Sequence, residues 1–175
     1  MPRNRTAPLS VMTRIGVLLL VSLAARAESV TTPLFVINVP DGWHIEDNKS
    51  SVVLIMGDRV RDGAPMPFLS VQYCVAKPEE GSFQRRCDEP CSEKRLTSQA
   101  EARGMRFAPV VKEESAEGAT QYRTHSVSPR EPSGFVALLC SNTGQVYISL
   151  ASDEPKKEAE AMFNDVVSSL HWNQP

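Results

Sequence analysis

Gln145-Val-Tyr-Ile-Ser-Leu-Ala151, followed by Glu154-Pro-Lys-Lys-Glu-Ala-Glu-Ala-Met-Phe-Asn-Asp-Val-Val-Ser-Ser-Leu170, predicts a β-strand and then an amphipathic α-helix. Ser152 or Asp153 is expected to cap this helix, with Pro155 in its first turn. A helix with one apolar stripe has to cover another apolar surface, so we expect a sheet beneath it. The apolar residues recur at the helical i, i+3, i+4 and i+7 spacing; they are Ala159, Met162, Phe163, Val166, Val167 and Leu170.

Further strands are indicated along the rest of the chain. Most of them alternate apolar and polar residues, which predicts one buried face. Residues 52–56 are apolar at every position, which predicts a central strand covered on both faces. A short surface helix is expected between Ser92 and Gly104. Hairpin-length connections then predict an α+β fold, a mainly antiparallel sheet flanked by helices. The candidate strands are residues 35–39, 43–46, 52–56, 68–75, 110–111, 122–127, 135–140 and 145–151.

The first 27 residues have the organisation of a secretory signal peptide. Three arginines precede an apolar run at residues 15–23, and Ala25-Arg-Ala27 gives a small-residue cleavage pattern. The run is about half of the roughly 20 residues that a membrane-spanning helix needs, so we expect cleavage before Glu28 rather than a membrane anchor. The expected mature chain, residues 28–175, suits a single domain and is expected in the periplasm.

The charge balance argues against a nucleic-acid partner. The whole chain has 19 basic and 21 acidic residues. Four arginines and no acidic residues lie in the first 27 positions, so the expected mature chain has 15 basic and 21 acidic residues and a net charge of −6. An acidic domain complements a basic protein surface and is repelled by a phosphate backbone. The acidic excess by itself is the usual solubility device of an exported domain. Together with the features below, we expect a protein partner, no nucleic acid and no membrane-spanning segment.

All four cysteines, Cys74, Cys87, Cys91 and Cys140, lie in the expected mature chain. An even number in an oxidising compartment predicts two disulfides, with three pairings open. Cys87 and Cys91 flank a polar turn that contains a proline, whereas the other two cysteines each lie late in a predicted strand. This favours Cys87–Cys91 together with Cys74–Cys140 and leaves the other two pairings as alternatives. The spacing fits neither a zinc site nor a redox-active Cys-x-x-Cys motif.

Near its start the chain reads Phe35-x-Ile-x-x-Pro40-x-Gly42-Trp43. Near its end it reads Gly144-Gln-Val-Tyr-Ile-Ser-Leu150 and Phe163-x-x-Val166-Val-x-Ser169-Leu-x-Trp172. These core and turn positions resemble the PsbP-like superfamily, which also holds the Ran-binding Mog protein and bacterial DcrB-type exported proteins. The resemblance implies a central antiparallel sheet flanked by helices, in a domain that is usually non-catalytic and binds or stabilises another protein. Some type VI secretion immunity proteins are similar in architecture.

The sequence carries no motif for catalysis or for metal binding. An enzyme commonly needs a nucleophile beside a base, and the three histidines are His44, His125 and His171. We interpret each as a surface or packing residue, because no Gly-x-Ser-x-Gly, Walker or His-Glu-x-x-His motif occurs. Acidic pairs such as residues 113–114 lack the alternating ligand spacing of a calcium loop. We expect no enzymatic activity, no metal and no cofactor.

Two long connections, residues 57–67 and 128–134, are the candidate partner-binding elements. They are longer than a minimal antiparallel sheet requires, and long loops often carry function. Arginine on a proline-containing loop suits a cleft lined with carboxylates, because its planar guanidinium can bind a carboxylate through two hydrogen bonds. The candidate residues are Arg59, Arg61 and Asp62 in the first connection and Pro129, Arg130 and Glu131 in the second.

These observations lead to two functional hypotheses. In the first, the protein is a periplasmic inhibitor or immunity protein that occludes an exported toxic hydrolase, as in type VI secretion. In the second, it is an envelope accessory protein that stabilises a membrane complex or holds a small apolar ligand between sheet and helix. A stoichiometric complex with one hydrolase would favour the first hypothesis, whereas lipid in the purified protein would favour the second.

Overall fold

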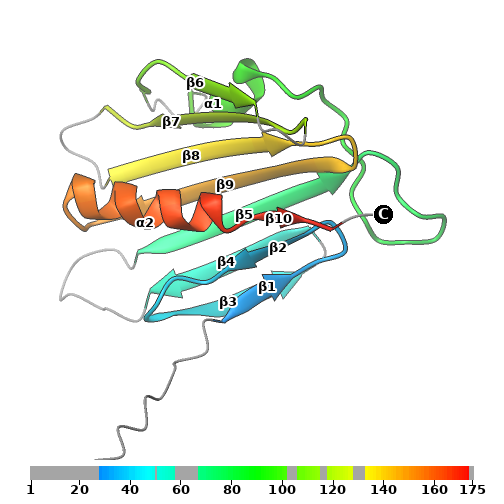
Figure 1. Cartoon of the computed structure of the whole chain (residues 1–175), viewed down its shortest axis with the longest axis horizontal. Coiled ribbons are helices and arrows are strands. Elements are labelled where there is room, and N and C mark those ends of the chain that lie inside the picture. The colour runs from blue at the N-terminus through cyan, green and yellow to red at the C-terminus, as the bar shows by residue number, and fades with distance from the viewer. Residues whose placement is uncertain are drawn as a thin grey trace, which may run out of the picture.

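The computed structural model describes residues 28–49, 51–57, 67–101, 106–114, 118–127 and 133–173. They form a seven-stranded sheet, a three-stranded sheet and two α-helices (Figure 1). The large sheet is antiparallel and has the order β3 (Trp43–Lys49), β4 (Val52–Gly57), β5 (Phe68–Val75), β9 (Gly144–Ser152), β8 (Ser133–Cys140), β7 (Thr120–His125) and β6 (Val111–Glu114). The small sheet has the order β1 (Ser29–Thr31), β2 (Phe35–Asn38) and β10 (His171–Trp172). The predicted α+β fold with a mainly antiparallel sheet is confirmed.

Helix α2 (Lys156–Ser168) packs its predicted apolar stripe against the large sheet (Figure 1). Ala159, Phe163, Val166 and Val167 are all buried. Phe163 is 2% exposed, and its ring stacks on that of Phe135 in β8 with the centroids 5.6 Å apart. This side of the large sheet is called the core face here. Helix α2 and the small sheet cover it together, which leaves its residues in β4, β5, β8 and β9 almost wholly buried.

The start of α2 differs from the prediction. Pro155 is itself the N-cap residue, and no side chain caps the helix. The Pro155 carbonyl accepts hydrogen bonds from the backbone N–H groups of Glu158 and Ala159, at 2.9 and 3.1 Å. Ser152 is the last residue of β9, so its hydroxyl lies before the helix and accepts a hydrogen bond from the Glu154 N–H instead.

The residues that carried the resemblance have structural roles. Gly42 adopts a φ of +73°, a left-handed conformation that favours glycine, and so makes the turn between β2 and β3. Trp43 and Trp172 are partly buried and pack against the main core. Phe35 meets Tyr73 of β5 edge to face, with the ring centroids 5.4 Å apart. These positions therefore join the small sheet to the large one.

The prediction that residues 52–56 form a central strand covered on both faces is wrong. Strand β4 lies next to the edge strand β3, and its residues alternate in burial. Val53 and Ile55 are fully buried on the core face, whereas Val52 is 44% exposed on the opposite side. Leu54 and Met56 share that opposite side and are half-buried. This second side of the large sheet is called the outer face.

Helix α1 (Glu93–Glu101) covers part of the outer face. Its start agrees with the prediction, since the Ser92 hydroxyl accepts a hydrogen bond from the Arg95 N–H at 3.3 Å. Leu96 is fully buried against Val136 and Leu138 of β8. Helix α1 contacts β7 and β8, so its cover lies over that half of the sheet.

The expected signal peptide, residues 1–27, lies outside the described residues. Within the described ranges, none of the helices has the length and apolar character needed to cross a membrane.

Replacing Phe163 by alanine should lower the free energy of unfolding by about 3–5 kcal/mol, because a cavity would open between α2 and β8. Lys157 is exposed on the same helix, so Lys157→Ala serves as the control and should cost little. Urea unfolding followed by circular dichroism measures both variants. Equal unfolding midpoints would mean that the stripe of α2 does not face the sheet.

Candidate partner-binding face

The predicted partner-binding residues lie outside the described residues. Arg59, Arg61 and Asp62 fall within 58–66, and Pro129, Arg130 and Glu131 fall within 128–132. The structure does place the ends of both connections. The Gly57 N–H donates to the Pro67 carbonyl at 3.1 Å, and the Ser126 N–H donates to the Gly134 carbonyl at 2.8 Å. Met56, Phe68, Ala151 and Gly134 occupy one row across β4, β5, β9 and β8, so both connections leave the same end of the sheet (Figure 1).

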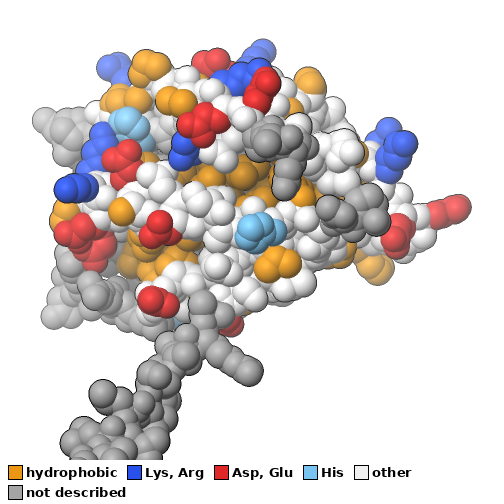
Figure 2. All heavy atoms as spheres, in the orientation of Figure 1, with side chains coloured by type: hydrophobic (Ala, Val, Ile, Leu, Met, Phe, Trp, Pro, Cys, Tyr) orange, Lys and Arg blue, Asp and Glu red, His pale blue; other side chains and the backbone are white. Residues whose placement is uncertain are grey.

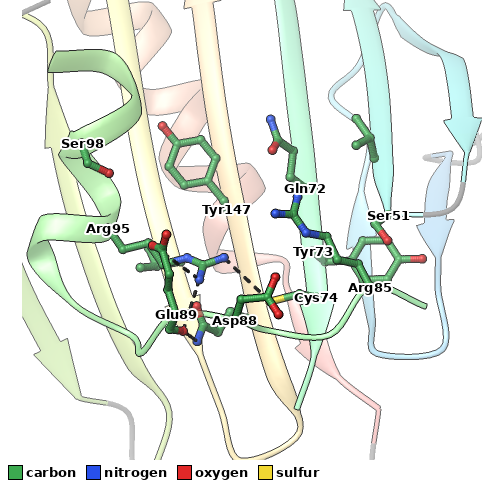
Figure 3. Close-up of a pocket in the computed structure, with 13 residues that line it drawn as sticks. Ser51, Gln72, Tyr73, Cys74, Arg85, Asp88, Glu89, Arg95, Ser98 and Tyr147 are labelled. Atoms are coloured by element: carbon green, nitrogen blue, oxygen red, sulfur yellow. Dashed lines mark hydrogen bonds and ion pairs between the residues drawn. The ribbon is translucent and has the colours of Figure 1, made fainter. Parts of the chain in front are cut away.

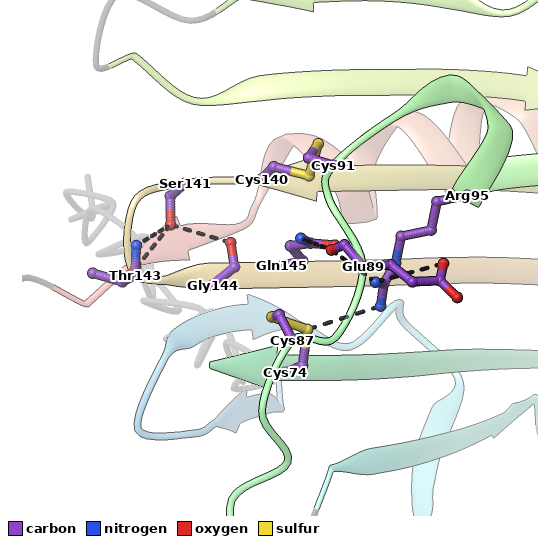
Figure 4. Close-up of a disulfide and its surroundings, with 10 residues drawn as sticks. All are labelled: Cys74, Cys87, Glu89, Cys91, Arg95, Cys140, Ser141, Thr143, Gly144 and Gln145. Atoms are coloured by element: carbon purple, nitrogen blue, oxygen red, sulfur yellow. Dashed lines mark hydrogen bonds and ion pairs between the residues drawn. A yellow bond between two sulfur atoms is a disulfide. The ribbon is translucent and has the colours of Figure 1, made fainter. Parts of the chain in front are cut away.

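The favoured disulfide pairing is wrong. The structure pairs Cys74 with Cys87 and Cys91 with Cys140, with sulfur–sulfur distances of 2.05 and 2.01 Å (Figure 4). Cys74 in β5 and Cys140 in β8 both lie opposite Gln145 of β9, the strand between them. Two strand spacings separate them by about 9.5 Å, whereas the Cα atoms of a disulfide lie within about 7 Å. A direct Cys74–Cys140 bond is therefore excluded by the strand order.

The two disulfides hold one segment across the outer face. Cys87 is tied to β5 and Cys91 to β8, so the chain between them crosses β9 (Figure 4). The carbonyl of Glu89 accepts hydrogen bonds from Gln145 Nε2 at 2.9 Å and from Arg95 Nη1 at 3.2 Å. Together these bonds fix the start of α1 over the β8 side of the sheet.

The rest of the outer face is uncovered by the described residues. In one row across the sheet, Val52, Gln72, Tyr147 and Leu138 lie side by side on β4, β5, β9 and β8. Exposure falls along this row from 44% at Val52 to 0% at Leu138. Phe68 at the other end of β5 is 39% exposed. The uncovered part is called the open face and consists of Val52, Leu54, Met56, Phe68, Ser70 and Gln72.

A cavity of about 140 Å³ lies between the open face and the disulfide-bonded segment (Figure 3). Its base includes Gln72, Gln145 and Tyr147 from the sheet, and its walls carry charged residues from the segment that leads into α1 and from α1 itself. Gln145 Oε1 is buried and has no hydrogen-bond partner among the described residues. The wall residues are Arg85, Asp88, Glu89, Arg95 and Ser98.

The electrostatics of this cavity favour a polar occupant. Arg95 is 22% exposed, and its Nη2 lies 3.9 Å from Cys74 Sγ. Sites for drug-sized ligands typically measure about 300–1,000 Å³ and are mainly apolar. This cavity is smaller and mainly polar, so it suits a single polar side chain or a small polar group.

The three histidines lie on three separate strands, β3, β7 and β10. His44 lies 3.4 Å from Glu46 at the exposed edge of the sheet. His125 packs against the ring of Phe135, with centroids 6.0 Å apart, and His171 is exposed. Within the described ranges, no group of three or more His, Cys, Asp or Glu side chains is placed to hold a metal ion.

This architecture is the PsbP-like sandwich. Among solved structures, the solution structure of cyanobacterial PsbP (CyanoP) from Synechocystis sp. PCC 6803 is similar, with a TM-score of 0.58 and 17% sequence identity. The match covers 85% of this chain and 92% of that chain. No protein-family model and no curated protein sequence matches this chain. At this identity the likeness confirms the fold that the sequence resemblance implied and carries no function with it.

The disulfide pairing can be tested by digestion with Asp-N, which cleaves before aspartate. Cleavage before Asp62, Asp88 and Asp153 gives the fragments 62–87 and 88–152, each of which contains two cysteines. The observed pairing predicts two separate fragments, each with an internal disulfide, in a non-reducing mass spectrum. Fragments joined to each other would contradict it, because both alternative pairings link residues 62–87 to residues 88–152.

Proposed function

We propose that this protein is an exported, non-catalytic domain that binds another protein through the open face. The observation that carries the proposal is the row of hydrophobic side chains on β4 and β5. Val52 and Phe68 are 44% and 39% exposed, and Leu54 and Met56 between them are half-buried. Contiguous exposed hydrophobic residues beside polar groups are typical of protein–protein contact sites.

The surroundings of the open face support a protein partner over a small apolar ligand. The polar cavity beside the open face can accept one polar side chain of a partner. The two long connections both start from the other end of the strands, in the row that holds Met56 and Phe68. The space beneath α2, where an apolar ligand held between sheet and helix would have to lie, is filled, and a hollow of about 300 Å³ opens at the side of the helix toward β7. Phe135, Phe163 and Val166 there are each at most 4% exposed.

The more specific form of the proposal is a periplasmic inhibitor or immunity protein that occludes an exported toxic hydrolase. Two disulfides are typical of an oxidising compartment. A net charge of −6 for residues 28–175 complements a basic partner surface. Arg59 and Arg130 lie in connections that start at one end of the sheet, where they would reach carboxylates in a hydrolase cleft.

The proposal predicts that a charge on the open face abolishes partner binding. The tagged full chain is expressed in its native host and purified with the proteins bound to it. Val52→Asp with Phe68→Asp should reduce the recovered partner at least tenfold, because a charge buried in an apolar interface is left unpaired. Val111→Asp with Phe83→Asp is the matched control, since both side chains are more than half exposed and neither belongs to the open face or to the two long connections.

The same purification separates the alternatives. A stoichiometric complex with one hydrolase that persists in high salt supports the inhibitor, whereas a large membrane assembly would support an envelope accessory protein. Arg59→Ala and Arg130→Ala should each weaken the complex, by about 2 kcal/mol if that arginine is an interface anchor. Equal recovery of the partner with the open-face variant and its control would contradict the proposal.

A further inference from the structure

A groove runs along the side of α2, between this helix and the connection from β2 to β3. Two adjoining hollows of about 440 and about 360 Å³ form it, and they share Asp41 and Met162. Figure 2 shows hydrophobic side chains in a hollow beside α2, with acidic side chains around it. The groove lies on the core-face side of the molecule, so it is separate from the open face.

The base of this groove is apolar. Trp43 and Met162 are partly buried and leave part of their surface exposed in the groove. Val39 and Val166, each 3% exposed, line the half nearer the end of α2, and Pro67 lines the other half. Exposed aromatic and methionine side chains in a concave surface are typical contact points for a partner.

The rim of the groove carries one sign of charge. Its charged residues are Asp41, Glu154, Glu158 and Asp165, and no lysine or arginine of the described part of the chain lines it. The structure shows no ion pair for Asp41, Glu158 or Asp165 among the residues it describes. Carboxylates around an apolar base concentrate negative potential where a partner would lie, which selects a cationic partner.

The order of these groups along α2 indicates the shape of the partner. Glu158, Met162 and Asp165 follow one another on the same side of the helix, with Glu158 and Asp165 about 10.5 Å apart along its axis. In an extended peptide, side chains on one side recur about every 6.7 Å. A basic residue, an apolar residue and a second basic residue at alternate positions therefore span about 13 Å. Flexible lysine side chains can bridge the difference between this span and the spacing of the two carboxylates.

We propose that this groove binds an extended, cationic segment of a partner protein. Its lysine or arginine side chains would lie against Glu158 and Asp165, and its apolar side chain would lie on Trp43 and Met162. The competing occupant is this chain itself, because Arg59 and Arg61 belong to the connection whose ends, Gly57 and Pro67, line the groove.

Calorimetric titration of the mature protein with a defined peptide tests the proposal. The probe is an acetylated, amidated octapeptide with lysine at positions 2 and 6, leucine at position 4 and serine elsewhere. At low ionic strength it should bind with a dissociation constant of about 100 µM or lower and should weaken as salt is added. A peptide with glutamine in place of both lysines should not bind. Absence of binding by the lysine peptide would overturn the proposal.

Variants locate the binding within the groove. Glu158→Gln with Asp165→Asn should weaken the lysine peptide about tenfold. Glu160→Gln with Glu93→Gln removes the same charge outside the groove and should change the affinity less than twofold. If both pairs of substitutions weakened binding equally, the effect would come from the net charge of the protein and not from the groove, and the proposal would be overturned. It would also be overturned if Arg59→Ala with Arg61→Ala tightened binding severalfold, since the chain's own arginines would then occupy the groove.

Discussion

A seven-stranded sheet has two faces to bury, and the other elements in the described part of this chain cover only one of them completely. Helix α2 and the three-stranded sheet close the core face, where Phe35, Phe163 and Ile148 are at most 2% exposed. Helix α1 has nine residues and contacts β7 and β8, and beyond it only the disulfide-bonded segment reaches β5, at Cys74. The hydrophobic residues of β4 and β5 on that side are left partly exposed, and the proposed partner would bury them.

The two disulfides determine which half of the outer face is covered. Cys87 bonds to β5 and Cys91 to β8, so the segment between them has to cross β9 at Gln145. Burial of Leu96 on β8 then holds α1 on the far side of that crossing. The two disulfides stabilise the position of a segment that the small hydrophobic cluster around Leu96 would hold only weakly. Neither disulfide holds a segment over the open face.

Local patterns in the sequence predicted the fold, but two features of the site depend on strand order. The stripe around Phe163 and the alternation in β5 and β9 are local, and both were confirmed. The cysteine pairing was mispredicted because the position of β9 between β5 and β8 is not visible locally. The prediction for residues 52–56 was wrong because a partly exposed apolar face has the same residue pattern as a covered one. The six loop residues predicted to bind a partner stay a prediction.

Hydroxyl-radical footprinting of the free, oxidised protein tests the half-covered outer face most directly, because four phenylalanines report on different surroundings. Phe83 is 94% exposed and serves as the reactive standard, while Phe35 and Phe163, at 0% and 2%, serve as protected standards. Phe68, at 39%, should be modified at a rate clearly between these standards. Protection of Phe68 equal to that of Phe35 would contradict an open face, because another part of the chain would then cover β4 and β5.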